Sequence, residues 1–174
     1  MTRLSCDCGA TTLDVDGPPI LAAECHCTSC RTAGHQLEAL GCPPVLAPNG
    51  GTHFVVHRKD RIFLASGGDE LAAFRLSPDA TTRRVIARCC RTPMYLEFSG
   101  GHWLSLYAAL WPVEPPPPEL RTMTRDVPAG TTLRDDIPNA RTHTVSFMGR
   151  LLWAWVRMGF RNPAVADVTR TFPS

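Results

Sequence analysis

Short apolar stretches alternate with turn residues over the first 112 positions of the chain. Runs rich in β-branched, aromatic and aliphatic residues, bounded by Gly, Pro, Asn and Asp, are typical of strands. A spacing of about ten residues per strand favours an all-β domain over βαβ units. The segments that fit this pattern are Thr11–Val15, Ile20–Ala23, Gln36–Leu40, His53–His57, Arg61–Ala65, Leu71–Leu76, Arg83–Ala87, Met94–Phe98 and Trp103–Tyr107.

The pattern changes after Pro112. Residues 113–143 open on the run Glu114–Pro118 and are rich in Pro, Thr and Asp, which predicts a stiff polyproline II linker and an irregular extension. Within residues 144–174, the segment Thr144–Phe160 has the spacing of an amphipathic helix. Its charged stripe is formed by Arg150, Arg157 and Arg161. The opposite, apolar arc is formed by Met148, Leu151, Leu152, Trp155 and Met158.

This C-terminal helix has two interpretations. An amphipathic helix usually supports a core, so we expect it to dock on the β domain at residues 1–112 or to form a homodimer contact with a second copy. Tryptophans beside arginines also suit a peripheral membrane anchor. At about 17 residues the segment is too short to span a membrane, and its internal arginines make it too charged to do so.

Composition narrows the function only slightly. The formal net charge of +2 is too small to predict nucleic-acid binding on electrostatic grounds. No apolar run opens the sequence and no stretch reaches about 18 apolar residues, so neither a secretory signal nor a transmembrane segment is expected. We therefore expect a cytoplasmic protein, whose thiols stay reduced and available to metal.

The cysteines carry the clearest chemical signal. Seven of the eight lie in three tight clusters, and the eighth, Cys42, is expected to be a small buried apolar residue. Thiols this close in sequence suit a metal better than disulfides, because Zn–S bonds of about 2.3 Å let sulfurs converge on one ion. The clustered residues are Cys6 with Cys8, Cys25 with Cys27 and Cys30, and Cys89 with Cys90.

Zinc needs four ligands in a closed structural site and three in a site that keeps a position open for chemistry. Cys25, Cys27 and Cys30 supply three sulfurs with no obligatory fourth nearby, so they form a candidate open site. Cys6 and Cys8 supply half of a site, and Cys89 with Cys90 is the pair that could complete it. Adjacent side chains in a strand point to opposite faces, so both members of that pair can bind one ion only if the backbone turns sharply there. The alternatives are a three-cysteine site completed by another group and the absence of a structural zinc ion.

The motifs resemble those of the glutathione-dependent formaldehyde-activating enzyme family, which includes centromere protein V. The resemblance covers Leu4–Trp111 and rests on C-x-C-G, then C-H-C-x-x-C-R, then a cysteine pair before Thr92-Pro93. It implies a mainly β fold of several coiled antiparallel sheets (a β-tent) around two zinc ions. One ion would be structural and one, at Cys25, Cys27 and Cys30, catalytic. The chain departs from the family pattern C-x-x-C-G at Ala87 and Arg91, which replace its first cysteine and its glycine.

The family condenses formaldehyde with glutathione, a carbon–sulfur lyase activity. By this resemblance a small thiol such as glutathione is the expected partner, held as a thiolate for attack on a small carbonyl. His35 and His26 are the nearest candidates for the acid or base. The alternatives are a solvent-facing His26 and a structural hydrogen bond at His35.

Two further interpretations remain. In the first, both zinc sites are structural and the chain is a non-catalytic interaction module, which predicts a closed fourth ligand at Cys25, Cys27 and Cys30. In the second, the dithiols are redox-active, which requires a thioredoxin-like βαβ setting that the sequence does not show.

Overall fold

The computed structural model describes residues 1–173 as two β-sheets and two α-helices. Ser174, the last residue of the predicted C-terminal tail, lies outside the described residues. The three-stranded sheet has the order β1 (Thr2–Ser5), β2 (Thr12–Val15), β5 (Ile62–Ser66). The eight-stranded sheet has the order β10 (Leu120–Thr122), β3 (Leu21–Cys25), β4 (Thr52–Arg58), β9 (Trp103–Tyr107), β8 (Thr92–Phe98), β7 (Thr82–Ala87), β6 (Leu71–Phe74), β11 (Arg170–Thr171).

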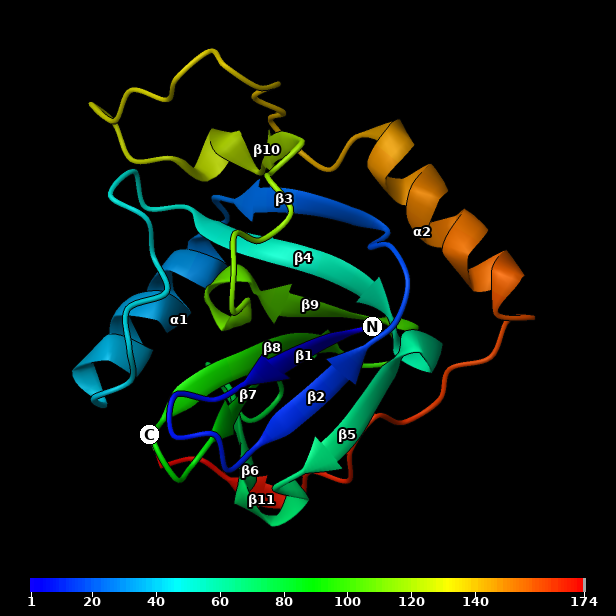
Figure 1. Ribbon diagram of the computed structural model, residues 1–174. Coiled ribbons are helices and arrows are strands. Elements are labelled where there is room, and N and C mark those ends of the chain that lie inside the picture. Colours follow the sequence, from blue (N-terminus) through cyan, green and yellow to red (C-terminus); the bar gives the residue numbers. More distant parts are fainter. Residues whose placement is uncertain (174) are drawn as a thin grey trace.

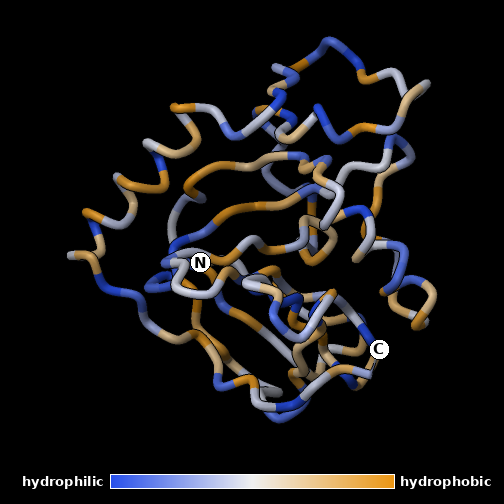
Figure 2. Tube along the Cα trace, turned by 180° about the vertical axis from the view of Figure 1, so that it is seen from behind, coloured by the Kyte–Doolittle hydropathy of each residue, from blue (hydrophilic) through white to orange (hydrophobic). Residues whose placement is uncertain are grey.

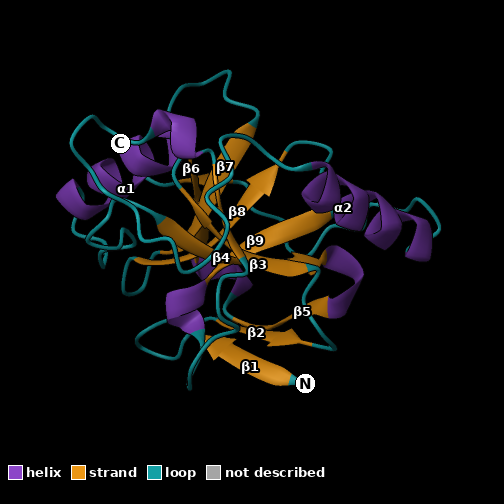
Figure 3. Cartoon of the chain, turned by 90° about the horizontal axis from the view of Figure 1, so that it is seen from above, coloured by secondary structure: helices purple, strands orange, loops and turns teal. Residues whose placement is uncertain are grey.

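The small sheet forms a separate layer in front of the large one (Figures 1 and 3). Residues on β2 alternate between partly exposed and buried positions, so one face of the small sheet turns inward. That face contributes Leu4, Leu13 and Ile62 to the main apolar core, where they meet Val85 and Leu106 of the large sheet. The predicted mainly β fold with a C-terminal helix is confirmed.

Both edges of the large sheet are closed by short strands from the C-terminal part of the chain. β10 pairs with β3 and β11 pairs with β6, and both pairings are parallel, whereas the strands between them run antiparallel. The extension after Pro112 is therefore joined by β10 to the strand that ends at Cys25. Four short 3-10 helices connect other elements: Lys59–Arg61, Gly68–Glu70, Ala108–Leu110 and Thr124–Asp126.

Helix α1 (Thr28–Ala39) corrects the prediction of a strand over Gln36–Leu40. Its buried residues are spaced as one helical face, and Gly34 on that face admits Leu46 so closely that an added Cβ would lie 2.6 Å from the leucine Cγ. The helix follows β3 directly, so its first turn lies at the end of that strand. The buried residues of this face are Cys30, Ala33, Gly34 and Leu37.

Helix α2 (Val145–Arg157) confirms the predicted C-terminal helix and docks on the large sheet. The Thr144 Oγ1 atom accepts a hydrogen bond from the Phe147 amide at 3.0 Å and caps the N-terminus. Leu151 packs against Leu21 and Val56, whereas Leu152 on the neighbouring side is 56% exposed. α1 and α2 lie on opposite sides of the molecule (Figures 1 and 3), and apolar and polar residues alternate along α2 (Figure 2).

Over residues 1–173, no helix combines the length and the apolar character that crossing a membrane requires.

Candidate metal centres

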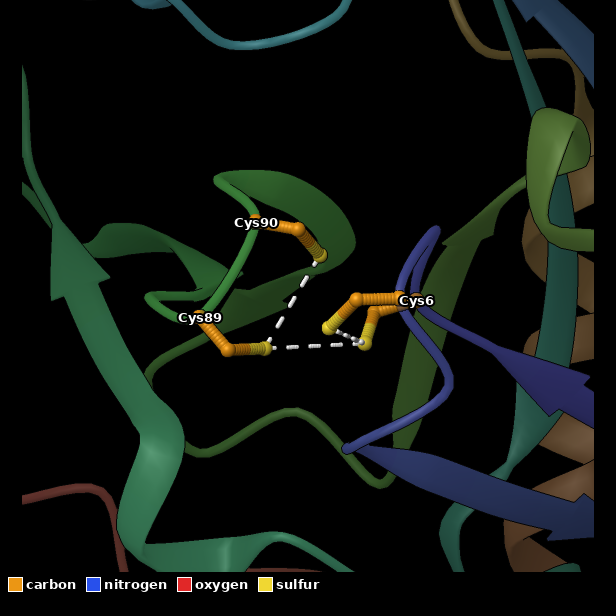
Figure 4. A group of neighbouring side chains, drawn as sticks. Cys6, Cys89 and Cys90 are labelled. Atoms are coloured by element: carbon orange, nitrogen blue, oxygen red, sulfur yellow. Dashed lines mark hydrogen bonds between the residues drawn. The ribbon is translucent and has the colours of Figure 1, made fainter.

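Four cysteines from distant parts of the chain form one cluster. Cys6 and Cys8 lie in the turn between β1 and β2, and Cys89 and Cys90 lie in the turn between β7 and β8. The Sγ atom of Cys6 is 3.6 Å from that of Cys8 and 3.7 Å from that of Cys89. The sulfurs of Cys89 and Cys90 are 3.8 Å apart. Figure 4 shows the labelled side chains converging on a common centre.

These distances fit a tetrahedral zinc site. Four sulfurs at about 2.3 Å from a central ion lie about 3.8 Å from one another. All four Sγ atoms of the cluster fall within 4.8 Å of each other. Cys8 and Cys89 are exposed while Cys6 is buried, so the cluster lies at the surface with one side in the core. The donor set and spacing suit a structural zinc ion.

The backbone turn explains how two adjacent cysteines reach the same point. Residues 88–91 form a turn rather than part of a strand, which removes the alternation that would point Cys89 and Cys90 apart. Arg91 closes the turn with φ at 61°, in the left-handed region that favours glycine. This is the position where the family pattern has glycine. The sharp turn that joint ligation requires is present.

Hydrogen bonds hold the sulfurs of this four-cysteine cluster. The Thr11 amide donates to the Cys6 Sγ atom at 3.3 Å. The hydroxyl of Thr92 lies 3.1 Å from the Cys90 Sγ atom and accepts a hydrogen bond from the Asp7 amide. Burial alone would raise the pKa of Cys90, but these contacts with Thr92 help to lower it to about 6. These contacts favour a thiolate at Cys90, whereas burial and the neighbouring thiols raise the pKa of Cys89.

The second cluster lies where β3 passes into α1. Cys25 ends the strand, Cys27 is the N-cap of the helix, and Cys30 lies buried in its first turn. The Cys30 amide donates to the Cys27 Sγ atom at 3.3 Å. The three sulfurs fall within 4.8 Å of one another, and over residues 1–173 no fourth Cys, His, Asp or Glu joins them. This three-cysteine cluster therefore offers three ligands and one open position.

Its surroundings favour negative charge on the sulfur of Cys27, whereas hydrogen bonds within the cluster and burial raise the pKa of Cys25 and of Cys30. Side-chain hydrogen bonds from Cys25 and Cys30 lower the pKa of Cys27 to about 2, and the positive charge of Arg84 acts in the same direction. The amides at the N-terminus of a helix stabilise a thiolate further. Arg84 is 1% exposed and donates from Nη2 to the hydroxyl and the carbonyl of Ser29, at 2.9 and 3.2 Å.

A cavity of about 460 Å³ adjoins the three-cysteine cluster, and all three cysteines line it. Most of its wall is apolar and comes from strands of the large sheet and from α2. We call it the cysteine cavity. Its few polar side chains include Arg84, Ser105, Thr122 and His143.

The two histidines singled out from the sequence lie elsewhere. His26 is 1% exposed, which corrects the expectation that it faces solvent, and its Nε2 atom lies 2.7 Å from the Glu24 carboxylate. Glu24 also pairs with the buried Arg121 of β10. His35 is exposed on α1. Neither histidine is among the residues that line the cysteine cavity, and their catalytic roles stay predictions.

His143 is the histidine that does line the cavity. Its Nδ1 atom lies 3.1 Å from the Thr122 hydroxyl, and its ring stacks on Phe147 with the ring centroids 4.7 Å apart. More than 110 positions separate it from the cysteines of the cluster, so spacing in the sequence gave no signal for it. Cys42 is 5% exposed and packs in an apolar cluster with Leu37 and Phe74, as expected.

One comparison with known proteins, that with family models, agrees with the motifs. Residues 1–41 match the family model described as glutathione-dependent formaldehyde-activating enzyme. This segment carries five of the seven clustered cysteines. A crystal structure of a Rhodobacter sphaeroides protein is similar, with 17% identity and a TM-score of 0.47 over 65% of this chain and 91% of that one. The comparison with curated proteins found no match. The predicted resemblance to the formaldehyde-activating family is confirmed over the matched segment.

Proposed function

We propose that this chain binds two zinc ions. The four-cysteine cluster would hold a structural ion that ties the β1–β2 turn to the β7–β8 turn. The three-cysteine cluster would hold a second ion with an exchangeable fourth position. Sulfur spacings of 3.6 to 3.8 Å support the first assignment, and the three convergent sulfurs support the second.

The observation that carries a catalytic function is the cavity beside the three-cysteine cluster. A structural zinc site is closed by four protein ligands, whereas a catalytic one leaves room for substrate. Here all three cysteines border about 460 Å³ of space, and within residues 1–173 no fourth ligand group completes the cluster. Zinc held by three thiolates supplies a soft Lewis acid that binds a substrate sulfur and keeps it deprotonated near neutral pH.

The reaction we propose joins a small thiol to a small carbonyl compound, or runs in reverse. An S–C bond forms at the carbonyl carbon, the C=O bond becomes C–O, and the proton lost by the thiol ends on that oxygen. Arg84 offsets the negative charge of the three thiolates. His143 lines the cavity, and we infer that it carries the proton through Nε2, because its Nδ1 atom lies beside the Thr122 hydroxyl. This is carbon–sulfur lyase-like chemistry, in keeping with the family resemblance.

The second candidate is a non-catalytic interaction module. The exposed side of α2 and the turn that follows it favour this candidate, because Leu152, Trp153 and Phe160 are each more than half exposed. Such a surface fits a second copy of this chain or another protein. These side chains supply no ligand to the three-cysteine cluster.

Zinc stoichiometry tests the proposal. Protein purified without added metal should contain two zinc ions, and Cys27→Ser should contain one while keeping its circular dichroism spectrum. Cys42→Ser is the matched control, since it removes a buried cysteine outside both clusters and should keep two ions. A single ion in the wild type, lost together with the fold in Cys27→Ser, would refute the open site and leave the interaction module.

A further inference from the structure

The wall of the cysteine cavity is apolar on two opposing sides. Strand residues such as Phe54, Leu96 and Trp103 form one side. The N-terminal half of α2 adds Phe147 and Met148. α2 lies beyond the segment that carries the family motifs, so this chain adds its own apolar surface to the site.

Charged groups in the cavity are few. Apart from the cysteines and His143, Arg84 is the charged or ionisable side chain among the described residues that line it, and no carboxylate does. Arg84 is buried and already donates to the carbonyl and the hydroxyl of Ser29. A ligand carboxylate would therefore compete for this one guanidinium. A second carboxylate or an ammonium group would lose its hydration and meet hydroxyls but no further partner of opposite charge among the described lining residues, which is costly in an apolar site.

Glutathione carries two carboxylates and one ammonium group, so this cavity matches it poorly. Volume is not the obstacle, since small-molecule pockets run from about 300 to 1,000 Å³ and this one holds about 460 Å³. Charge is the obstacle. An uncharged aryl or alkyl body would instead bury apolar surface against Phe54, Trp103 and Met148, which is favourable.

We propose that the cysteine cavity takes a thiol with an uncharged apolar body, aryl or alkyl, in preference to a peptide thiol such as glutathione. This inference rests on the proposed function, because the three-cysteine cluster must bind the thiol sulfur. α2 then acts as a specificity element that covers the body of the substrate. Met148 is the residue on α2 that tests this most cleanly, since it borders the cavity and is half exposed.

Calorimetric titration of the zinc-loaded protein tests the inference without relying on turnover. The probes are benzyl mercaptan, glutathione, and benzyl alcohol as the same body without sulfur. We expect benzyl mercaptan to bind at least tenfold more tightly than glutathione, and benzyl alcohol to bind more weakly than benzyl mercaptan. Equal or tighter binding of glutathione would overturn the substrate class and leave the proposed function standing. Failure of every thiol to bind would overturn both.

A pair of variants on the same helix locates the binding site. Met148→Glu places a carboxylate at the cavity wall and should weaken benzyl mercaptan at least tenfold. Leu152→Glu is the matched control, because it is 56% exposed on α2 and is not part of that wall, and it should leave the affinity unchanged. Both substitutions replace exposed side chains, so both should keep the unfolding midpoint of the wild type. Equal effects of the two variants would refute the role of α2.

Discussion

Single side chains set the charge balance on both sides of the large sheet. Arg84 is buried against the three-cysteine cluster, and its charge offsets the negative charge that three thiolates would carry there. On β8, the carboxylate of Glu97 balances the positive charges of two cations, Lys59 and Arg83. It lies 2.7 Å from Lys59 Nζ and 2.6 Å from Arg83 Nη2. Lys59 is only 6% exposed, and its ammonium group has this carboxylate and the Asn162 Oδ1 atom, at 3.2 Å, as polar partners.

Glu97 should make folding stability depend on pH. Burial by itself raises the pKa of Glu97, but the hydrogen bonds and charges of Lys59 and Arg83 outweigh it and lower the pKa below 4.5. A lowered folded-state pKa means that this contribution is complete above the unfolded value near 4.5 and is lost as the pH falls through the folded value. Glu97→Gln should lower the free energy of unfolding by about 2–3 kcal/mol at pH 7, and this cost should become smaller as the pH falls through the folded-state pKa of Glu97.

Urea unfolding of wild type and Glu97→Gln at a series of pH values measures this difference directly. Other carboxylates titrate in the same range, so the quantity to compare is the difference between the two curves. This difference in the free energy of unfolding should become smaller as the pH falls. A difference that is constant from pH 7 to pH 3 would show that the ion pairs of Glu97 do not stabilise the fold.

The sequence pattern predicts one of the two α-helices well and the other poorly. α2 is predicted by the amphipathic spacing of Thr144–Phe160, and the structure adds that Thr144 caps its N-terminus. At α1 the pattern instead predicts a strand over Gln36–Leu40, because only four residues of the helix are buried and one of them is Gly34. Its start is set by Cys27, whose sulfur serves as the N-cap, a role that propensity alone does not signal. The edge strands β10 and β11 are too short to show an alternating pattern.

Docking of α2 predicts opposite results for two neighbouring leucines. Leu151 is 3% exposed and packs on Leu21, Ala23 and Val56, so Leu151→Ala should lower the free energy of unfolding by about 2–4 kcal/mol. Leu152→Ala, at an exposed position, should change it by less than about 0.5 kcal/mol. Urea unfolding measures both free energies, and the comparison holds when the m-values equal that of the wild type. Similar losses for the two variants would mean that α2 does not dock through Leu151.

At the scale of the whole molecule, the sequence predicted which cysteines cluster but not what surrounds them. The four-cysteine cluster joins residues 83 positions apart, a pairing inferred because no other cysteine pair was free. The cysteine cavity draws its wall from α1, α2, the segment at His143 and the strands β3, β4, β7, β8, β9 and β10, so only the folded chain reveals it. For the same reason the sequence points to the nearer His26 and His35 and gives no signal for His143.

The most direct test of the account is whether the three-cysteine cluster keeps an open metal position. Cobalt(II) replaces zinc in such sites, and its visible absorption reports any change in the ligand set. Protein loaded with two cobalt ions would be titrated with 2-mercaptoethanol, a small neutral thiol, with Cys27→Ser as the reference for the four-cysteine site. One equivalent of thiol should change the wild-type spectrum and leave that of Cys27→Ser unchanged. A wild-type spectrum that stays constant at saturating thiol, with both sites filled, would contradict the open site.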